Sequence, residues 1–541
     1  MTLRIDRRSL IVAGTLGLGA LAIPGFARAF ALLEAQGFTH SVASGEPGPQ
    51  SMLLWTRYVP AGGGEARLRV EVSATADFAK VAAAGEAVTG PWRDWTAKIT
   101  VTGLRPGTRY FYRFVGPDGS FSPVGRTRTL PEGAAKRFTL GIFSCSNLAF
   151  GHFNAYAHAA ARDEIDLAVH LGDYIYEYGP GVYPSEAEAV AGRLPLPTSE
   201  CLQLADYRLR YASYRSDPDL QALHAATPML VQWDDHETAN NSWEGGAENH
   251  QPAEGDWNVR KAAGMQAFRE WMPVSDAPWA SYDIGDLATF FRTESRLLGR
   301  SRSPDIAPLF QQADPAKALA AFRDGPWRDP AASMLGSTQE AWLGAALARS
   351  VRSGRKWQVA GFGTIMGSAS APEQAGEWLR GDSPARVRAV VAASVAAGRL
   401  GLPLDFDNWG GYPAARARFL ESAQGAGANL LVVCGDSHNA WAFDLAQGGK
   451  PAGVEFAGHA VTSSGYESAF AADPKVIAAG LVARNPELKW CDTSRRGYMA
   501  LTLTPEQASN QWVFVDTVRE RSAGASIGHG ATVSRGRNVI G

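Results

Sequence analysis

Four short polar motifs carry side chains that together could bind metal ions. Each motif directly follows a short apolar run that reads as a β-strand. In chain order, the motifs supply Cys145, Asp173 with Tyr176, Asp235 with His236 and Asn240, and Asp436 with His438. Thiols, phenols, carboxylates, amides and imidazoles are the donors that hard and borderline cations take in proteins. One Gly-Asp or Asp-His pair is common in turns, but four motifs in this order predict a metal site.

The spacing inside two of the motifs fits ligands of one centre. A Gly-Asp-x-x-Tyr pattern allows Asp173 to bridge two ions while Tyr176 binds one of them as a phenolate. Asp436 and His438 are two residues apart, so an extended backbone points both side chains to the same side. The spacing therefore supports a metal site and allows more than one ion, with the number of ions left open.

The elements that must position these motifs alternate between strands and helices. Short apolar runs predict strands at residues 138–143, 167–171, 229–233, 357–360 and 430–434. Residues 154–164 look helical, and Ser337-x-x-Glu340 has the pattern of a capping box that opens another helix. This alternation predicts an α/β domain at residues 136–520, with β-sheets covered by helices. In such sheets ligand groups gather just past the carboxyl ends of strands, where the motifs lie.

The segment before this domain reads as all-β. Residues 66–72 and 96–101 alternate apolar and polar side chains, with the period of two of a half-buried strand. The run from Leu104 to Tyr110, Leu-x-Pro-x-Thr-x-Tyr, resembles the tyrosine-corner segment of fibronectin type III sandwiches. We therefore expect a small fibronectin-III/Ig-like β-sandwich at residues 38–131. For the C-terminal tail at residues 521–541, the sequence leaves a lid and disorder as open alternatives.

Residues 1–29 read as an export signal. Arg7-Arg8 precedes an apolar run from Leu10 to Phe26, and Ala27-Arg28-Ala29 follows as a small-residue cleavage site. The paired arginines point to the twin-arginine translocase as a partner and to a periplasmic or secreted protein. The apolar run is shorter than the ~20 residues that a membrane span needs. An uncleaved anchor is the alternative interpretation.

Composition excludes several classes of protein. The chain has 541 residues, 45% of them hydrophobic, which is typical of a globular protein rather than a disordered one. A formal net charge of −2 gives no basic excess for gripping a nucleic-acid backbone. Four cysteines are too few for a disulfide scaffold. Cys434 lies inside an apolar strand and is interpreted as core, whereas Cys201 and Cys491 could pair after export or stay free.

The order of the motifs resembles one known family. The sequence reads Ser-Cys at 144–145, His-Leu-Gly-Asp-Tyr-Ile-Tyr-Glu at 170–177, Trp-Asp-Asp-His-Glu-x-x-Asn-Asn at 233–241 and Gly-Asp-x-His at 435–438. This order resembles the PhoD-type alkaline phosphatase/phosphodiesterase family of the calcineurin-like metallophosphoesterases. Residues 42–47 and 54–57 also look like the opening of that family's sandwich domain. The resemblance covers nearly the whole chain after residue 37.

The resemblance implies an exported metallophosphatase domain preceded by a small sandwich. Such an enzyme hydrolyses phosphomonoesters, phosphodiesters or both through attack by a metal-activated water or hydroxide. The resemblance implies Fe(III) held by Cys145 and Tyr176 and bridged by Asp173, with Ca²⁺ beside it; other divalent metals stay open. It completes the cluster with Asp235, Asn240, Asp436 and His438, where Asn241 offers the same chemistry as Asn240.

His236 stands beside a ligand, and we interpret it as catalytic rather than ligating. As an imidazolium it could stabilise the oxygens of the transition state or protonate the leaving alkoxide. Two other functions stay open. One is a phospholipase D-type phosphodiesterase that acts on lipid or wall-polymer head groups. The other is a non-catalytic surface-binding protein, against which the intact ligand set argues.

The sequence departs from the family pattern at three places. Glu294 and Arg296 stand where Asp-x-Arg is usual, Gly410 stands where an Asp is expected, and Glu46 replaces another Asp. These departures leave the metal ligands intact but bear on substrate preference. Arg296 and Arg496 could bind phosphate, although arginines more often form structural ion pairs.

Overall fold

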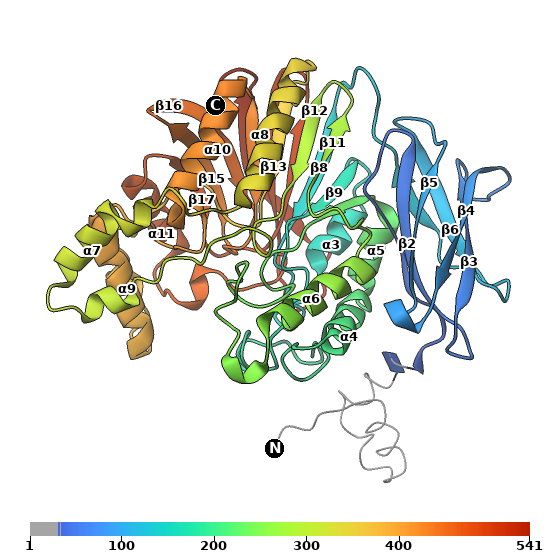
Figure 1. Cartoon of the computed structure of the whole chain (residues 1–541), viewed down its shortest axis with the longest axis horizontal. Helices are drawn as coiled ribbons and strands as arrows, with labels where there is room; N and C mark the ends of the chain where they lie inside the picture. The colour runs from blue at the N-terminus through green and yellow to red at the C-terminus, as the bar shows by residue number, and fades with distance from the viewer. Residues whose placement is uncertain (1–30, 33) are drawn as a thin grey trace, which may run out of the picture.

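Three β-sheets organise the fold in the computed structural model of the chain (Figure 1). The structure describes residues 31, 32 and 34–541, so the export signal predicted at residues 1–29 lies outside the described residues. Among the described residues, no helix is both long and apolar enough to cross a membrane.

The largest sheet has nine strands and contains three of the strands that carry motifs. Its order is β20 (Ala525–Ser534), β19 (Gln507–Val515), β18 (Gly497–Leu503), β8 (Phe138–Phe143), β9 (Leu167–His170), β10 (Met229–Val231), β1 (Gly37–Gly45), β2 (Ser51–Val59) and β5 (Thr96–Thr102). Strands β8, β9, β10 and β1 pair in parallel, so their carboxyl ends meet at one edge. Strands β9 and β10 end one and two residues earlier than the sequence predicts, which leaves Leu171, Gln232 and Trp233 in the loops that follow.

The second sheet has seven strands and contains the remaining motif strand. Its order is β11 (Ala280–Ile284), β12 (Ala288–Arg292), β13 (Trp357–Gly361), β14 (Leu430–Cys434), β16 (Lys450–Ala457), β15 (Ala440–Gln447) and β17 (Leu488–Asp492). Strands β12, β13, β14 and β16 are parallel.

The two large sheets pack face to face, and helices cover their outer faces. Leu140 and Val169 of one sheet share a core with Leu431 and Val433 of the other. The helices on the nine-stranded sheet are α3 (Asn154–Ala160), α4 (Leu204–Arg215), α5 (Pro218–Ala226) and α6 (Trp257–Trp271). Those on the seven-stranded sheet are α8 (Gly336–Arg352), α10 (Pro413–Ala426) and α11 (Pro474–Arg484). Helices α7 (Pro315–Asp324) and α9 (Ala385–Arg399) project at one end as a lobe (Figure 1).

The N-terminal part is mostly β, as expected. A four-stranded sheet of β4 (Val81–Thr89), β3 (Ala66–Ser73), β6 (Arg109–Val115) and β7 (Gly125–Arg128) packs on β1, β2 and β5. The Tyr110 hydroxyl accepts a hydrogen bond from the Arg105 N–H at 2.9 Å, the bond typical of a tyrosine corner. Kinship with fibronectin or immunoglobulin sandwiches stays a prediction, because β1 and β2 also extend the large sheet.

Two local features differ from the sequence analysis. The start of helix α8 is bonded by Ser333, whose Oγ accepts from the Gly336 N–H at 2.7 Å, so the capping-box prediction at Ser337 is wrong. Ser337 already lies inside the helix. The C-terminal segment supplies β20 to the end of the nine-stranded sheet, where it pairs with β19, instead of forming a lid or a disordered tail.

The sequence left open whether Cys201 and Cys491 form a disulfide. All four cysteines are buried and free, so Cys201 and Cys491 form no disulfide in this structure.

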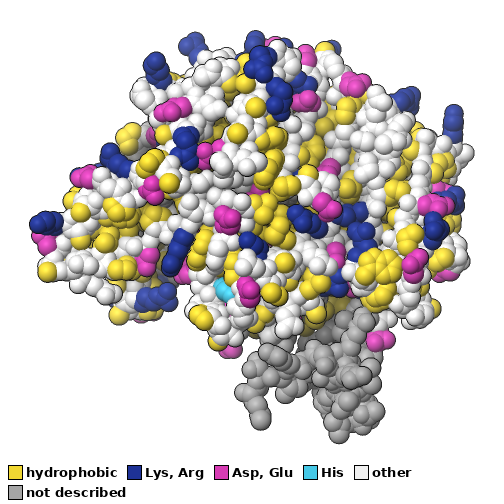
Figure 2. Space-filling view, in the orientation of Figure 1, with side chains coloured by type: hydrophobic (Ala, Val, Ile, Leu, Met, Phe, Trp, Pro, Cys, Tyr) yellow, Lys and Arg dark blue, Asp and Glu magenta, His cyan; other side chains and the backbone are white. Residues whose placement is uncertain are grey.

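On the face seen in Figure 2, basic and acidic side chains are interspersed. That face carries no continuous basic patch of the kind that grips nucleic acid.

Candidate metal centre

The candidate site lies where the carboxyl ends of parallel strands from both sheets converge. Loops after β8, β9 and β10 approach loops after β12 and β14. The functional side chains on these loops are Cys145, Asp173, Asp234, Asp235, His236, Arg296, Asp436 and His438. Because two facing sheets contribute, residues far apart in the chain become neighbours.

Possible ligand atoms form three overlapping groups, each with all its atoms within 4.8 Å of one another. The groups are Cys145–Asp173–His438, Asp173–Asp235–His236 and Asp234–Asp235–Asp436. Five of the seven predicted ligands therefore come together in one cluster. His236, which we expected beside the ligands, and Asp234, which we did not select, belong to it as well.

Tyr176 also lies in the cluster. Its hydroxyl donates to Asp173 Oδ2 at 3.3 Å and lies 3.1 Å from His438 Nε2. The Ser463 Oγ donates to the same phenol oxygen at 2.6 Å. Burial, together with Asp173, raises the pKa of Tyr176 well above its usual value. A phenolate at this place therefore needs a cation beside it.

His438 has the orientation of a metal ligand. Its Nδ1 lies 2.8 Å from the Ser464 carbonyl oxygen, which can only accept, so the proton sits on Nδ1. This leaves the lone pair of Nε2 directed at Tyr176 and the cluster. Burial lowers the pKa of His438 to about 3, so the ring is neutral, as ligation requires.

The backbone is strained at the predicted ligands. Cys145, Asp173, Asp436 and His438 all have positive φ, between 54° and 62°. Non-glycine residues rarely adopt this conformation, and such strain clusters at functional sites. Gly172 before Asp173 has φ of 112°, which strongly favours glycine at this position.

His236 is held by Glu177 and packs on Tyr176. Its Nδ1 lies 2.7 Å from Glu177 Oε2, and its ring centroid lies 4.2 Å from that of Tyr176. Burial lowers the pKa of His236, but the carboxylates of Asp235, Glu177 and Asp173 outweigh burial and hold it well above its usual value. The imidazolium that the sequence analysis invoked therefore suits this environment.

Asn240 contacts the periphery of the cluster. Its side-chain amide donates to Glu248 at 3.2 Å, and its backbone N–H donates to Glu177 Oε1 at 2.8 Å. Asn241, the alternative, donates its backbone N–H to Asp235 Oδ2 at 2.6 Å. A ligand role for Asn240 stays a prediction.

The donor set fits metal ions. Asp173 Oδ1 and Asp235 Oδ1 are buried and accept no hydrogen bond from the described part of the chain, and Asp235 Oδ1 lies 3.5 Å from Arg296 Nη2. Burial raises the pKa of Asp173 and of Asp436 well above the usual value, and neighbouring carboxylates raise both further. Oxygens buried in this way are stabilised by a cation, and the neighbouring thiol and imidazole match the softer of the implied metals.

Three buried side chains support the cluster, although the sequence did not predict this role for them. They are Glu237, Arg296 and Glu294. Glu237 accepts from the backbone N–H groups of Asp173 at 3.1 Å, Tyr174 at 2.6 Å and Asp234 at 2.7 Å. Its place inside the Asp-Asp-His-Glu motif was the available signal. Arg296 proves to be an ion-pairing residue, with contacts to several of the carboxylates.

Glu294 organises the loop that carries Arg296. Its carboxylate accepts from the Trp233 indole at 2.8 Å and from the backbone N–H groups of Arg296, Leu297 and Leu298 at 2.6–3.0 Å. In the sequence alone, Glu294 stands out only as a departure from the family pattern.

Two further residues that lie near the site in the sequence, His170 and Arg496, contact other side chains of the protein. His170 shares a hydrogen bond of 2.8 Å with the Tyr156 hydroxyl, behind the cluster. Arg496 pairs with Glu467. Both arginine predictions thus resolve toward ion pairs rather than open phosphate contacts.

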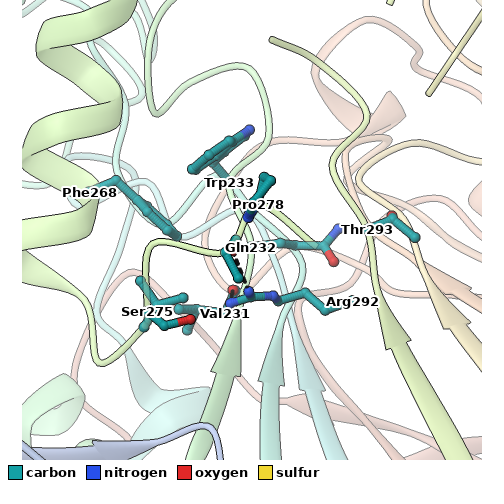
Figure 3. Close-up of a pocket in the computed structure, with 10 residues that line it drawn as sticks. Val231, Gln232, Trp233, Phe268, Ser275, Pro278, Arg292 and Thr293 are labelled. Atoms are coloured by element: carbon teal, nitrogen blue, oxygen red, sulfur yellow. Dashed lines mark hydrogen bonds between the residues drawn. The ribbon is translucent and has the colours of Figure 1, made fainter. Parts of the chain in front are cut away.

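A small cavity lies beside the loops that follow β10 and β12. Arg292 spans it, donating to the backbone carbonyls of Val231 at 3.4 Å and Ala277 at 2.6 Å (Figure 3). The volume of this cavity is about 10 Å³, which is room for no more than one water molecule. This cavity is therefore too small to receive a phosphoester.

Comparison with solved structures defines the class of protein. The structure of purple acid phosphatase PPD1 from yellow lupin (Lupinus luteus) seeds matches with a TM-score of 0.56 at 13% identity, covering 92% of this chain and 74% of that one. A solved structure of PhoD matches with a TM-score of 0.76 at 29% identity, covering 94% of this chain and 92% of that one. The fold is that of a metallophosphatase.

Sequence comparison then gives the family. The family model described as PhoD-like phosphatase matches residues 140–512, and that of the PhoD-like phosphatase N-terminal domain matches residues 25–131. Alkaline phosphatase D of Bacillus subtilis (strain 168) is 32% identical over an alignment of 513 residues that covers 90% of this chain and 79% of that protein. This chain belongs to the PhoD-like phosphatase family and is a phosphoester hydrolase, which sets aside the non-catalytic alternative.

Proposed function

We propose that this chain is an exported, metal-dependent phosphoesterase that hydrolyses phosphomonoesters, phosphodiesters or both. The observation that carries the proposal is the cluster of Cys145, Asp173, Asp235, Asp436 and His438, whose possible ligand atoms gather in groups no wider than 4.8 Å. A buried oxygen of Asp173 that accepts no hydrogen bond from the described residues supports the same conclusion.

The proposed ligands divide by chemistry. Cys145, Tyr176, Asp173 and His438 would hold Fe(III), because its high charge suits the anionic thiolate, phenolate and carboxylate, and imidazole is a common ligand of iron. Asp235, Asp436 and the Asn240 amide would hold Ca²⁺, with Asp173 shared between the ions. When bound, these ions supply positive charge that polarises the P–O bonds and lowers the pKa of the attacking water.

The chain's own residues would donate a proton during hydrolysis and fix the orientation of the two histidines of the site. Glu177 accepts the Nδ1 proton of His236 at 2.7 Å and so fixes which ring nitrogen faces away from it. His236 Nε2 then carries the proton that protonates the leaving alkoxide or stabilises negative oxygens in the transition state. Ser464 fixes the tautomer of His438 in the same way.

The experiment compares phosphate-ester hydrolysis by the wild type and by Asp173→Asn. Release of p-nitrophenol is measured from p-nitrophenyl phosphate and from its bis-ester. We expect Asp173→Asn to lower kcat/KM at least about 100-fold on whichever ester the wild type cleaves. Asp283→Asn, which removes a surface carboxylate paired with Arg355, is the control and leaves both rates unchanged. Normal hydrolysis by Asp173→Asn would overturn the proposal.

The ratio of the two rates separates the activities. A preference for the bis-ester identifies a diesterase and keeps the phospholipase D-type alternative open for a test on lipid substrates. A preference for the monoester excludes that alternative as the main activity.

A further inference from the structure

Arg296 lies in the middle of the acidic half of the site. Its Nε is 2.6 Å from Asp234 Oδ1, and its Nη2 is 3.1 Å from Asp234 Oδ2. The same Nη2 is 3.1 Å from Asp436 Oδ1 and 3.5 Å from Asp235 Oδ1. One guanidinium therefore touches all three carboxylates of this acidic group.

The donors of Arg296 are almost completely used inside the protein. The side chain is fully buried, and its Nη1 pairs with Asp407, which also pairs with Arg300 at 2.6 Å. Four hydrogen bonds to carboxylates engage a group that has five N–H donors. Little capacity is left for a direct contact with a phosphate.

The space around Asp234 is shaped for this ion pair. A Cβ on Gly363 would lie 2.1 Å from Asp234 Oδ1, and one on Gly172 would lie 2.3 Å from Asp234 Cβ. Both glycines therefore make room for the Asp234 side chain. The carboxylate has both oxygens on Arg296, in the bidentate geometry of a strong pair.

We propose that Arg296 is a positioning residue that acts as the built-in cation of the site. It keeps Asp234 occupied, so that Asp234 is not a metal ligand, and it holds Asp235 and Asp436 together at the edge of the metal site. The contacts of Arg296 with the three carboxylates support the charge pairing. The effect of Arg296 on metal binding rests on the proposed function.

The experiment measures thermal unfolding of the full chain after removal of metal with a chelator. Arg296→Gln leaves the buried Asp234 and Asp235 and the part-buried Asp436 without this counter-charge, and we expect its Tm to fall by about 5 °C or more. Adding Asp234→Asn removes the charge that Arg296 compensates, so the double variant should recover at least half of the loss. Arg296→Lys keeps the charge but loses the fork, and should fall between the wild type and Arg296→Gln.

Arg292→Gln is the matched control. Arg292 is another buried arginine at the end of β12, but it pairs with Glu46 at 2.7 Å. Asp234→Asn should therefore not restore Arg292→Gln. If Arg296→Gln does not fold, recovery of soluble protein by the double variant carries the same information. Failure of Asp234→Asn to improve Arg296→Gln by either measure overturns the proposal.

A second readout separates Arg296 from a phosphate-binding role. Removing a direct contact to phosphate would raise the inhibition constant of inorganic phosphate more than about tenfold with metal-free stability unchanged, and that result overturns the proposal. We also expect Ca²⁺ to raise the Tm of Arg296→Gln more than that of the wild type, because Asp234 is released. Absence of any Ca²⁺ effect in every variant would count against the proposed metal site, while the metal-free rescue would still support the ion pair.

Discussion

At the centre of the site, one carboxylate ties two ligand-bearing loops together. Glu237 accepts three backbone N–H groups, from the loop after β9 and from the loop after β10. These bonds fix the strained backbone of Asp173, whose φ is 54°. The geometry of the site therefore depends on a buried carboxylate that is not itself one of the predicted ligands.

We predict that Glu237→Gln weakens both the fold and the site. A glutamine amide directs its own N–H groups at donors, so at least one buried N–H loses its acceptor. The free energy of unfolding should fall by about 2–4 kcal/mol, and kcat should fall with it. Chemical denaturation and steady-state kinetics measure the two effects. Exposed Glu506→Gln is the control, and equal stability of the two variants would refute this role.

At the scale of elements, the N-terminal strands are part of the sheet that bears the site. Strand β1 pairs in parallel with β10 at Gly45 and Met229, and β10 leads directly into Asp234 and Asp235. The Trp55 indole on β2 donates to the Glu270 carbonyl on α6 at 2.8 Å, which attaches the N-terminal strands to a helix that covers the same sheet. The N-terminal part thus supports the edge of the catalytic sheet.

This arrangement makes Gly45 sensitive to substitution. A Cβ at Gly45 would lie 2.0 Å from the Pro273 carbonyl oxygen and 2.9 Å from that of Met229. We expect Gly45→Ala to cost about 3 kcal/mol, as overpacking does, and to lower activity by moving β10. A Cβ at Gly62 meets nothing within 4 Å, so Gly62→Ala is the control. Matching melting curves for the two variants would show that the pairing does not support the site.

The start of helix α8 gives a second prediction at this scale. Ser333 Oγ accepts from the Gly336 N–H, whereas Ser337 lies inside the helix. Ser333→Ala should therefore destabilise the protein by about 1 kcal/mol, and Ser337→Ala should have little effect. The reverse order in denaturant unfolding would favour the capping box that the sequence pattern suggests.

The sequence predicted which candidate ligands lie close together better than it predicted the network around them. Cys145, Asp173 and Asp436 follow short apolar strands, and the rule that ligands gather past strand ends is enough to bring them together. Nothing local marks the pairing of Arg296 with Asp234, because it exists only after two sheets pack face to face. The prediction at Ser337 failed for a local reason: the Ser-x-x-Glu pattern alone does not show where the helix begins, and α8 begins at Gly336.

At the scale of the whole molecule, two facing sheets place buried charge where one sheet would leave it exposed. Carboxylates after β10 and β14 share a fully buried arginine that follows β12. In this environment an unpaired carboxylate is costly, so the Arg296 cation is part of what holds the site together, and the proposed metal ions would act in the same way.

The proposed export concerns the whole chain, and we propose that its signal contains Arg7-Arg8. Replacing both by lysine should retain the precursor in the cytoplasm, because the translocase recognises the arginine pair. Replacing Arg4 by lysine is the control. Cell fractionation with N-terminal sequencing reads both location and cleavage after Ala29. Unchanged export of the double-lysine variant would contradict the twin-arginine route.

The most direct test of the metal centre is the metal content of the protein purified through its own export route, measured by elemental analysis after exhaustive dialysis. We predict that the wild type retains iron together with calcium, and that Asp173→Asn loses at least half of the iron while Asp283→Asn keeps it. A wild type that retains neither iron nor any divalent metal, or an Asp173→Asn variant with an unchanged metal content, would contradict the proposed centre.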